Sequence, residues 1–483
     1  MKKNNKSLSN KISRFYDGIA KNRKKWLKKG SAFHKEDSLN IKELILPNSS
    51  ILELGCGTGN LLKSLKPSYG VGIDLSKEII KEAKKNNRGL KFIQGDIAKL
   101  SNTLKKKEKF DYIILSDTIG YLDDIQSSLE GLHEFCNKET RVIISYYSPL
   151  WSPIFSLATF FKFKMPEVQT QLLNLTDIKS FLKISNFDVV RFKKKILIPV
   201  NLLGLGRIVN RYLATIPIFS FFCLRQYVVA RSLECVNKSK YKSASIIIPC
   251  KNEKGNIESA IKRLPRFSNK MEVIFIEGNS TDNTWEKIQL IKKKYSNTKS
   301  GFTIKSYKQK GKGKAEAVFF GFEKASNEIL FILDADLTMP PEELPKFWRK
   351  IVSGEAEYVN GTRLIYPMDN DAMRFLNFLA NKMFSLLFSW ILSQRYTDTL
   401  CGTKVLSKHN YNKIKIKNED LGKFDPFGDF FIIFGSSRMC LKMCEIPIRY
   451  KARSYGETQI SRFSHGFMLI KMVLFAYFKI KAI

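Results

Sequence analysis

Two aspartates separated by a single residue follow a strongly apolar run in the second half of the chain. In LFILDADLTMP (330–340), Asp334 comes directly after four apolar residues, and Asp336 follows after Ala335. Side chains at positions i and i+2 of an extended chain point the same way, so we expect the two carboxylates to converge. Converging carboxylates repel each other unless a cation lies between them, and Mg²⁺ or Mn²⁺ prefers oxygen ligands of this kind. The spacing predicts a divalent metal site at a strand end; the alternative is a pair of solvated turn carboxylates.

A glycine-rich turn in the first half predicts a nucleotide site of another design. The run ILELGCGTGN ends a predicted strand and places Gly55, Gly57 and Gly59 just before a predicted helix. Glycines allow the chain to turn tightly and let a ligand approach the backbone. Asp74 ends the next predicted strand, about twenty residues further on, where a carboxylate can bind both ribose hydroxyls.

Short apolar runs that alternate with Lys- and Glu-rich helical segments must position these residues. One such alternation extends from about residue 40 to 147, and a second begins at ASIIIPC and ends near residue 460. Between them, residues 234–243 are polar and unpatterned, which is typical of a linker. We therefore predict an α/β protein with two Rossmann-like domains, residues 1–233 and 244–483, the second carrying amphipathic C-terminal helices.

Composition is that of a globular protein with an excess of positive charge. The 483 residues include 82 Lys and Arg against 45 Asp and Glu, a net charge of +37. This excess favours a phosphate-bearing partner or an anionic bilayer, or else reflects a general bias toward lysine. The eight dispersed cysteines form no CxxC pair, so we expect reduced thiols in the cytoplasm and no zinc site. The uncharged apolar runs 212–224 and 383–394 are too short to span a bilayer.

The glycine run resembles motif I of class I S-adenosylmethionine-dependent methyltransferases, over roughly residues 40–150. Asn60 stands where a dinucleotide site would have its third glycine. The resemblance implies that the turn passes the methionine moiety of S-adenosylmethionine, Asp74 holds the ribose, and Asp96 with Ile97 holds the adenine. It assigns cofactor binding to Glu53, Gly55, Gly57, Gly59, Asp74, Asp96, Ile97 and Ser116. No residue stands out as a general base, and the methyl acceptor is not specified.

Three runs in the second half resemble, in order and spacing, family 2 glycosyltransferases with the GT-A fold. They are SIIIPCKNEKGN, VIFIEGNSTDN and ILFILDADLTMPPE, and the resemblance covers residues 244–460. The group resembled includes the dolichyl- and polyprenyl-phosphate sugar synthases. It implies a nucleotide-sugar donor and a lipid-linked or polysaccharide acceptor. It assigns donor binding to Pro249, Asn252, Glu253, Glu277 and Asp334, and metal binding to Asp334 and Asp336.

Further matches concern the reacting groups. Arg363 in NGTRLIYP resembles a phosphate contact, and Asp398 in RYTDTLCGTKVL resembles an acceptor-side residue. Asp429 in FGDFF is the predicted general base if the acceptor is a hydroxyl; an ionised phosphate needs none. Where the family has paired acids, this chain has Glu277 followed by Gly278, so the nucleotide is left open.

Two apolar segments predict contact with a membrane. Residues 374–395 and 467–483 read as helices with wide apolar faces, which must be buried in protein or lie in a bilayer interface. A peripheral protein at the inner face of the cytoplasmic membrane is expected.

We predict a bifunctional enzyme that transfers methyl groups and, in a metal-dependent and inverting reaction, sugars. Inversion is expected because one displacement suffices and no nucleophile for a double displacement is found. The alternatives are a basic RNA-binding methyltransferase, or a fusion whose glycosyltransferase half is an inactive scaffold. The sequence carries no RNA-reading motif or aromatic platform, so nucleic acid is not an expected partner.

Overall fold

The computed structural model divides the chain into two compact units. Unit 1 is Met1–Lys238 with Ala482–Ile483, and unit 2 is Ser239–Lys481. The boundary falls inside the polar stretch 234–243, although residues up to Val236 are helical. Residues whose structure is described are 8–104, 108–168, 171–236, 241–296, 301–367, 375–417, 425, 428–456 and 462–482.

Unit 1 contains a seven-stranded sheet with the order β3-β2-β1-β4-β5-β7-β6. Strands β1 to β5 are parallel, and β7 runs antiparallel to both of its neighbours. The order reverses between β1 and β4, and in such open sheets ligands bind at this switch point, beyond the carboxyl ends of the strands. The strands are β1 Ser50–Leu54, β2 Tyr69–Asp74, β3 Lys91–Gln94, β4 Tyr112–Ser116, β5 Arg141–Tyr147, β6 Phe187–Lys195 and β7 Arg225–Ser232.

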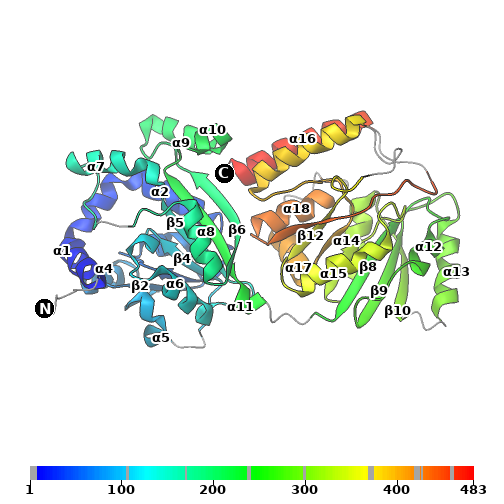
Figure 1. Cartoon of the computed structure of the whole chain (residues 1–483), viewed down its shortest axis with the longest axis horizontal. Coiled ribbons are helices and arrows are strands. Elements are labelled where there is room, and N and C mark those ends of the chain that lie inside the picture. Colours follow the sequence, from blue (N-terminus) through cyan, green and yellow to red (C-terminus); the bar gives the residue numbers. More distant parts are fainter. Residues whose placement is uncertain are drawn as a thin grey trace. The chain divides into compact units, whose positions relative to one another are not determined.

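The helices of unit 1 cover both faces of this sheet (Figure 1). In α4, Ile79, Ile80 and Ala83 are buried while lysines face solvent, and Ser76 caps the first turn by accepting a hydrogen bond from Ile79 N at 3.1 Å. The helices are α1 Leu8–Lys29, α2 Ser31–Lys42, α3 Asn60–Leu65, α4 Lys77–Asn86, α5 Leu100–Thr103, α6 Ile125–Glu130, α7 Ser152–Phe160, α8 Leu175–Ile184, α9 Leu205–Arg211, α10 Pro217–Ser220 and α11 Leu233–Val236. The 3₁₀ turns are η1 Ile97–Lys99, η2 Ile119–Tyr121, η3 Gly131–Phe135, η4 Pro149–Trp151, η5 Leu202–Gly204 and η6 Leu213–Thr215.

Unit 2 contains a second seven-stranded sheet, with the order β10-β9-β8-β11-β13-β12-β14. Strand β13 is antiparallel to β11 and β12, and the other neighbours are parallel. Its switch point lies between β8 and β11. The strands are β8 Ser243–Cys250, β9 Lys270–Glu277, β10 Phe302–Lys308, β11 Ile329–Ile332, β12 Tyr358–Thr362, β13 Lys404–Ser407 and β14 Met443–Pro447.

Helix α18 lies in the interior of unit 2, with every residue from Asp429 to Ser437 buried. Helices α16 and α19 run side by side along one edge of this unit (Figure 1). The helices are α12 Ile257–Lys262, α13 Thr284–Ser296, α14 Lys314–Lys324, α15 Leu344–Val352, α16 Phe375–Leu392, α17 Lys408–Lys417, α18 Asp429–Arg438 and α19 Arg462–Ala476. Short turns add η7 Pro341–Glu343 and η9 Tyr477–Lys481.

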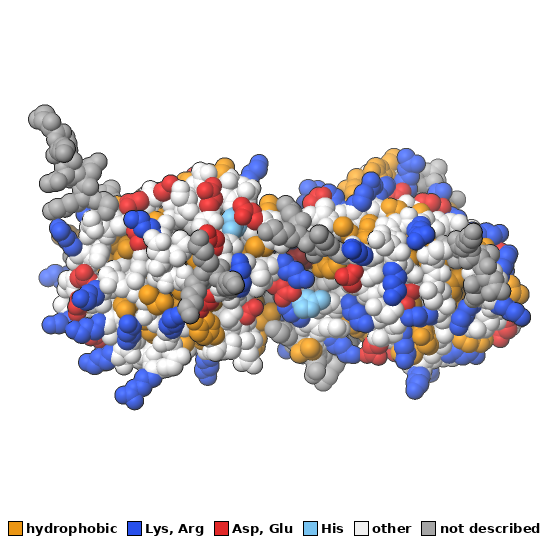
Figure 2. All heavy atoms as spheres, turned by 90° about the horizontal axis from the view of Figure 1, so that it is seen from below, with side chains coloured by type: hydrophobic (Ala, Val, Ile, Leu, Met, Phe, Trp, Pro, Cys, Tyr) orange, Lys and Arg blue, Asp and Glu red, His pale blue; other side chains and the backbone are white. Residues whose placement is uncertain are grey.

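The predicted fold class, two α/β Rossmann-like domains, is confirmed. The central strands are apolar on both faces, as expected for parallel strands that helices cover on each side. Lys and Arg side chains are scattered among acidic ones over the face of both units that Figure 2 shows, rather than gathered in one patch. In the described part of the chain, no helix is long and apolar enough to cross a membrane.

Candidate active sites

A cavity of about 1010 Å³ opens at the carboxyl ends of the parallel strands of unit 1, at the switch point of the sheet. Six of the eight predicted cofactor residues line it: Glu53, Gly55, Asp74, Asp96, Ile97 and Ser116. Gly57 and Gly59 do not line the cavity but belong to the turn beneath it. The sequence pattern and the cavity therefore point to the same place.

The glycine turn is needed for close packing. Gly55 has a φ of +72°, and a Cβ added there would lie 2.3 Å from Thr118 Oγ1. Gly59 has a φ of +74° and begins α3, and its Cβ would lie 2.5 Å from the ring of Phe92. No side chain fits at either position, because Thr118 and Phe92 already occupy the space that a Cβ would need.

The acids at the ends of β2 and β3 hold backbone N–H groups. Asp74 accepts hydrogen bonds from Gly57 N at 2.9 Å and from Ser76 N at 3.0 Å. Burial raises the pKa of Asp74, and these two hydrogen bonds oppose that shift. Asp96 caps η1 by accepting from Ala98 N at 3.0 Å. Both carboxylates are held at the cavity wall.

Glu53 is buried at the base of the cavity. Its Oε2 accepts a hydrogen bond from Leu62 N at 3.1 Å, which satisfies a donor in the first turn of α3. Burial raises the pKa of Glu53 to about 8. This carboxyl is protonated through part of the neutral range and helps to hold the glycine turn against α3.

Helix α1 covers the cavity and brings a cation to it. Tyr16 OH donates to Tyr121 OH at 3.0 Å, and both side chains line the cavity. The guanidinium of Arg23 lies over the Tyr16 ring, 5.3 Å from its centroid, and its buried Nε has no hydrogen-bond partner among the described residues. A Cβ on Gly57 would lie 3.0 Å from Arg23 Nη2, so this cation borders the glycine turn.

A buried arginine that the sequence analysis missed organises the other wall. Arg225 on β7 donates to the carboxylate of Asp37 on α2 from Nε at 2.9 Å and from Nη2 at 3.0 Å, and it also pairs with Asp117. Its Nη2 reaches Ser116 Oγ at 3.0 Å. Burial raises the pKa of Asp117 to about 6, although Arg225 opposes the shift. In the sequence, the only available sign of this role was that an arginine begins a strand with an apolar centre.

In unit 2 the two predicted metal ligands have different hydrogen-bonding partners. Strand β11 ends at Ile332 and the chain turns at Ala335, so the alternation of an extended strand does not apply to this segment. Asp334 Oδ1 lies 2.6 Å from Lys314 Nζ, which holds the pKa of Asp334 low although burial alone would raise it. Lys314 pairs with Asp334 and also interacts electrostatically with Asp336.

Asp336 belongs to a second cluster. Its Oδ1 accepts from Thr338 N at 3.1 Å and from Thr338 Oγ1 at 2.9 Å, and its Oδ2 accepts from Arg453 Nη2 at 2.8 Å. Arg453 Nη1 donates to Glu253 Oε1 at 2.9 Å. One arginine thus joins a predicted metal ligand to a predicted donor-binding acid.

The remaining predicted donor residues lie in the loops after β8 and β9. Pro249 is the penultimate residue of β8. Asn252 has a φ of +56°, donates from its N to Ser280 Oγ at 3.0 Å and accepts from Thr281 N at 2.8 Å. Glu277 ends β9 and accepts from Ser280 N at 2.5 Å. The two hydrogen bonds of Asn252 join these loops to each other at the carboxyl ends of β8 and β9.

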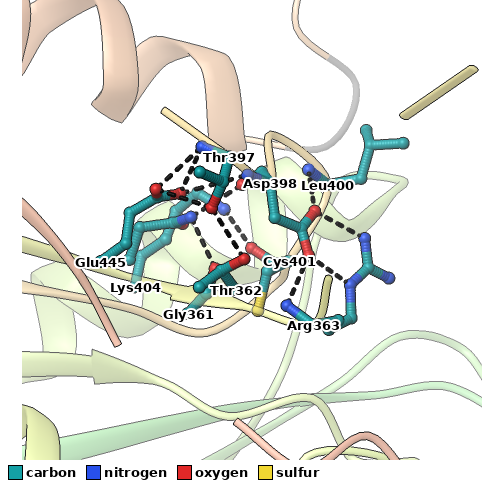
Figure 3. A network of polar contacts seen from close by, with 10 residues as sticks. Gly361, Thr362, Arg363, Thr397, Asp398, Leu400, Cys401, Lys404 and Glu445 are labelled. Carbon is teal, nitrogen blue, oxygen red and sulfur yellow. Dashed lines mark hydrogen bonds and ion pairs between the residues drawn. The ribbon is translucent and has the colours of Figure 1, made fainter. Parts of the chain in front are cut away.

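Arg363 and Asp398, predicted as reacting groups, bind each other (Figure 3). Arg363 donates to the Asp398 carboxylate from Nε at 2.7 Å and from Nη2 at 2.8 Å. Asp398 is buried, its Oδ1 also accepts from Leu400 N at 3.1 Å, and Arg363 holds its pKa low against the effect of burial. Asp398 therefore positions Arg363. Arg363 Nη1 has no partner among the described residues.

Asp429 and Gly402 complete the environment of Asp334. Asp429 is buried at the start of α18, and its Oδ1 forms an ion pair with Lys404 Nζ at 3.1 Å. A Cβ on Gly402 would lie 1.8 Å from Asp334 Oδ2 and 2.7 Å from Lys314 Nζ. The loop before β13 can approach Asp334 only because it carries a glycine there.

The described ranges contain no group of three or more His, Cys, Asp or Glu side chains arranged to hold a metal ion, and the predicted pair of Asp334 and Asp336 is smaller than such a group. Lys314 and Arg453 were missed as partners of the two aspartates. The run KGKGK (310–314), which ends where α14 begins, was the available signal for Lys314.

Family comparisons agree with this division of the chain. A model described as a methyltransferase domain matches residues 45–171, and one described as glycosyl transferase family 2 matches residues 245–431. The first range includes all the predicted cofactor residues, and the second includes Asp334, Asp336 and Asp429. Both predicted resemblances are confirmed, and both units contain a transferase domain.

Individual relatives match only parts of the chain. Dolichol-phosphate mannosyltransferase of Pyrococcus furiosus is 34% identical over 128 residues, 25% of this chain and 34% of that protein. Undecaprenyl-phosphate 4-deoxy-4-formamido-L-arabinose transferase of Proteus mirabilis is 24% identical over 227 residues, 46% of this chain and 64% of that protein. A solved SAM-dependent methyltransferase from Thermotoga maritima is 16% identical, covers 46% of this chain and 99% of its own, and has a TM-score of 0.35. The chain therefore spans less than two thirds of the curated relatives it matches.

The raised pKa of Glu53 predicts a pH-dependent cost to stability. Below a pH of about 4.3 the carboxyl is protonated in both states, but between that value and about 8 only the unfolded chain ionises fully. Wild-type stability is therefore lost as the pH rises through this window. We expect the free energy of unfolding of Glu53→Gln, relative to that of wild type, to rise by on the order of 4 kcal/mol between pH 5 and pH 8. Thermal unfolding curves of both proteins measure this difference. A difference between the two proteins that is constant with pH would contradict this.

The close approach at Gly402 predicts that Gly402→Ala is destabilising. The added methyl group would displace Asp334 or the loop, and overpacking of this kind costs about 1–3 kcal/mol. Gly466→Ala on α19 is the matched control, because a Cβ there meets nothing within 4 Å. Chemical denaturation of both variants measures the difference. Equal stability of the two would show that the loop moves freely away from Asp334.

Proposed function

We propose that the chain is a bifunctional enzyme. Unit 1 transfers a methyl group from S-adenosylmethionine, and unit 2 transfers a sugar from a nucleotide sugar to a lipid-linked or other cell-envelope acceptor. One observation supports both halves: in each unit, acidic side chains lie at the switch point of a sheet that a transferase family model matches.

The cavity of unit 1 fits S-adenosylmethionine. Asp74, Asp96 and Ile97 line the cavity, where Asp74 would bind the ribose and Asp96 with Ile97 would border the adenine. Arg23, whose buried Nε lacks a partner among the described residues, is placed to face the methionine carboxylate. The cofactor supplies an electrophilic methyl group, and the protein's task is to align an acceptor with it.

Asp74 provides the test of the first half. We expect Asp74→Ala to weaken S-adenosylmethionine binding roughly 10- to 100-fold in titration calorimetry, because hydrogen bonds to a charged group contribute about 1.5–3 kcal/mol each. Glu134→Gln is the control, since Glu134 is exposed and does not line the cavity. Wild-type affinity in the Asp74 variant would exclude our assignment of this residue.

The carboxylate and cation clusters of unit 2 suit a nucleotide sugar. Asn252, Glu253 and Glu277 lie where we place the nucleoside of the donor, beside Pro249. Lys314, Arg363 and Arg453 are placed to stabilise the diphosphate that leaves, as fixed cations in a partly enclosed site do.

Asp334 and Asp336 fit a divalent ion by the chemistry of their oxygens. Both side chains are partly exposed, so a metal nucleotide can reach them. Mg²⁺ or Mn²⁺ held there would neutralise charge on the leaving diphosphate. Without it, Lys314 and Arg453 supply the neutralisation.

Asp429 is the proposed base if the acceptor is a hydroxyl. It is buried, and its Oδ1 forms an ion pair with Lys404 Nζ at 3.1 Å. A phosphate acceptor would be ionised already and would leave Asp429 a role in binding. Transfer inverts the anomeric centre, because one displacement at one site suffices.

Helices α16 and α19 are proposed to lie on the cytoplasmic face of a membrane. The polar Asn381 and Ser385 of α16 are buried in the protein, whereas Leu379, Met383 and Leu386 are exposed. On the neighbouring segment Phe467, Ile470, Leu474 and Phe478 are exposed as well. An apolar face turned outward, with Lys382, Lys471 and Lys479 beside it, suits a bilayer interface.

Binding of nucleoside diphosphates tests the second half. We expect titration with a panel of uridine, guanosine, cytidine and thymidine diphosphates to give one ligand that binds roughly tenfold more tightly with Mn²⁺ than with EDTA. Asp336→Asn should remove the effect of the metal, and Glu355→Gln, an exposed acid paired with Lys350, should not. Binding that is unaffected by the metal and by Asp336→Asn would reject the metal site. If no nucleoside diphosphate of the panel binds, unit 2 is better explained as an inactive scaffold.

A further inference from the structure

Helix α7 of unit 1 buries none of its side chains within the described structure. Its sequence is SPIFSLATF, and none of the nine residues is buried. Leu157 is 61% exposed and Phe160 is 79% exposed. Short helices are stabilised mainly by packing of their apolar side, so an apolar helix of this kind calls for a further partner.

A second apolar segment of unit 1 is exposed beside it. Residues 196–224 form η5, α9, η6 and α10, where Leu203 is fully exposed and Ile218 is 74% exposed. The two segments contact each other, since Trp151 Nε1 donates a hydrogen bond to Phe222 O at 2.9 Å. We define the apolar surface by its exposed large side chains: Leu150, Ile154, Leu157, Phe160, Phe161, Phe163, Val200, Leu202, Leu203, Leu205, Ile208, Leu213, Ile216, Ile218, Phe219, Phe221 and Phe222. Helices α7, α9 and α10 lie along one side of unit 1 (Figure 1).

The charges on these segments have one sign. Residues 149–166 and 196–224 include Lys162, Lys164, Arg207 and Arg211 but no Asp or Glu. Neighbouring elements contribute acids at two places, where Glu167 pairs with Lys164 and Glu36 pairs with Arg207. Basic side chains that flank a wide apolar area match a surface of anionic lipid headgroups.

The same segments form part of the cavity wall. Trp151, Ile154 and Phe163 come from the first segment, and Pro199 and Val200 from the second. Whatever covers the apolar surface therefore lies next to the cavity in which we place S-adenosylmethionine.

We propose that the apolar surface docks unit 1 on an anionic bilayer, so that the cavity receives an amphiphilic methyl acceptor from the lipid. The docking rests on the apolar surface and its charges alone, and the class of acceptor rests also on the proposed methyl transfer. Lys and Arg are the only charged residues of the two segments, and they match anionic lipid headgroups. Exposed apolar areas of this extent mark interaction sites.

Vesicle co-sedimentation of the full chain tests the docking. The background carries Leu386→Glu, which removes one apolar contact of α16 in unit 2. Vesicles contain phosphatidylcholine alone or an equal mixture with phosphatidylglycerol. We expect the mixed vesicles to bind the protein more tightly, and Leu157→Glu with Phe160→Glu to weaken that binding roughly tenfold or more, since two apolar side chains leave the lipid. Neither residue lines the cavity.

Ile184→Glu is the matched control, because Ile184 is also exposed but lies on α8, outside the apolar surface. Unchanged S-adenosylmethionine affinity in the double variant shows that it is folded. Vesicle binding equal to wild type in the double variant would overturn the proposal. A wild-type dimer that the double variant converts to monomer, with vesicle binding unchanged, would assign the surface to a second copy and overturn it as well.

The acceptor is tested with labelled S-adenosylmethionine and vesicles of total membrane lipid. Transfer of the label to the organic phase, reduced in the double variant, supports an amphiphilic acceptor. Label that enters only water-soluble products overturns that part while the docking stands. A protein that sediments with vesicles but does not bind S-adenosylmethionine would reject the proposed methyl transfer and leave the docking intact.

Discussion

Charges gathered at the carboxyl ends of parallel strands must be neutralised, and most of the structure around both sites follows from this constraint. In unit 1 the fully buried Arg225 faces Asp37 and Asp117, which come from α2 and the end of β4. Removing one member of such a buried set leaves an uncompensated charge and costs roughly 3–5 kcal/mol. The pairs therefore fix the relative positions of elements that are far apart in sequence.

The two units meet this constraint in different ways. Unit 1 leaves a large cavity lined by its acids, with the cation of Arg23 at one side and a glycine turn that no side chain blocks. In unit 2, ion pairs lie at the strand ends: Lys314 pairs with Asp334, and Arg453 pairs with Asp336. An organic cofactor needs room, whereas a diphosphate needs fixed positive charge, and the two arrangements correspond to these needs.

Both units also place apolar side chains on the outside, on elements added to the sheet rather than part of it. Helices α16 and α19 do so in unit 2, and α7 with residues 196–224 does so in unit 1. In α16 the polar Asn381 and Ser385 face inward, the reverse of an ordinary surface helix. Lipid contact would explain why both units expose apolar side chains on these elements.

The sequence by itself determined the two α/β folds, the glycine turn and the acids at the strand ends, because these depend on local periodicity and on side chains that only certain turns accept. It did not determine the partners of those acids. We expected Asp334 and Asp336 to converge because we read them as part of an extended strand, whereas β11 ends at Ile332 and the chain turns at Ala335. Lys314, Arg453 and Arg225 reach their carboxylates only through tertiary contacts across roughly 20 to 190 residues of chain, and no local pattern encodes such distances.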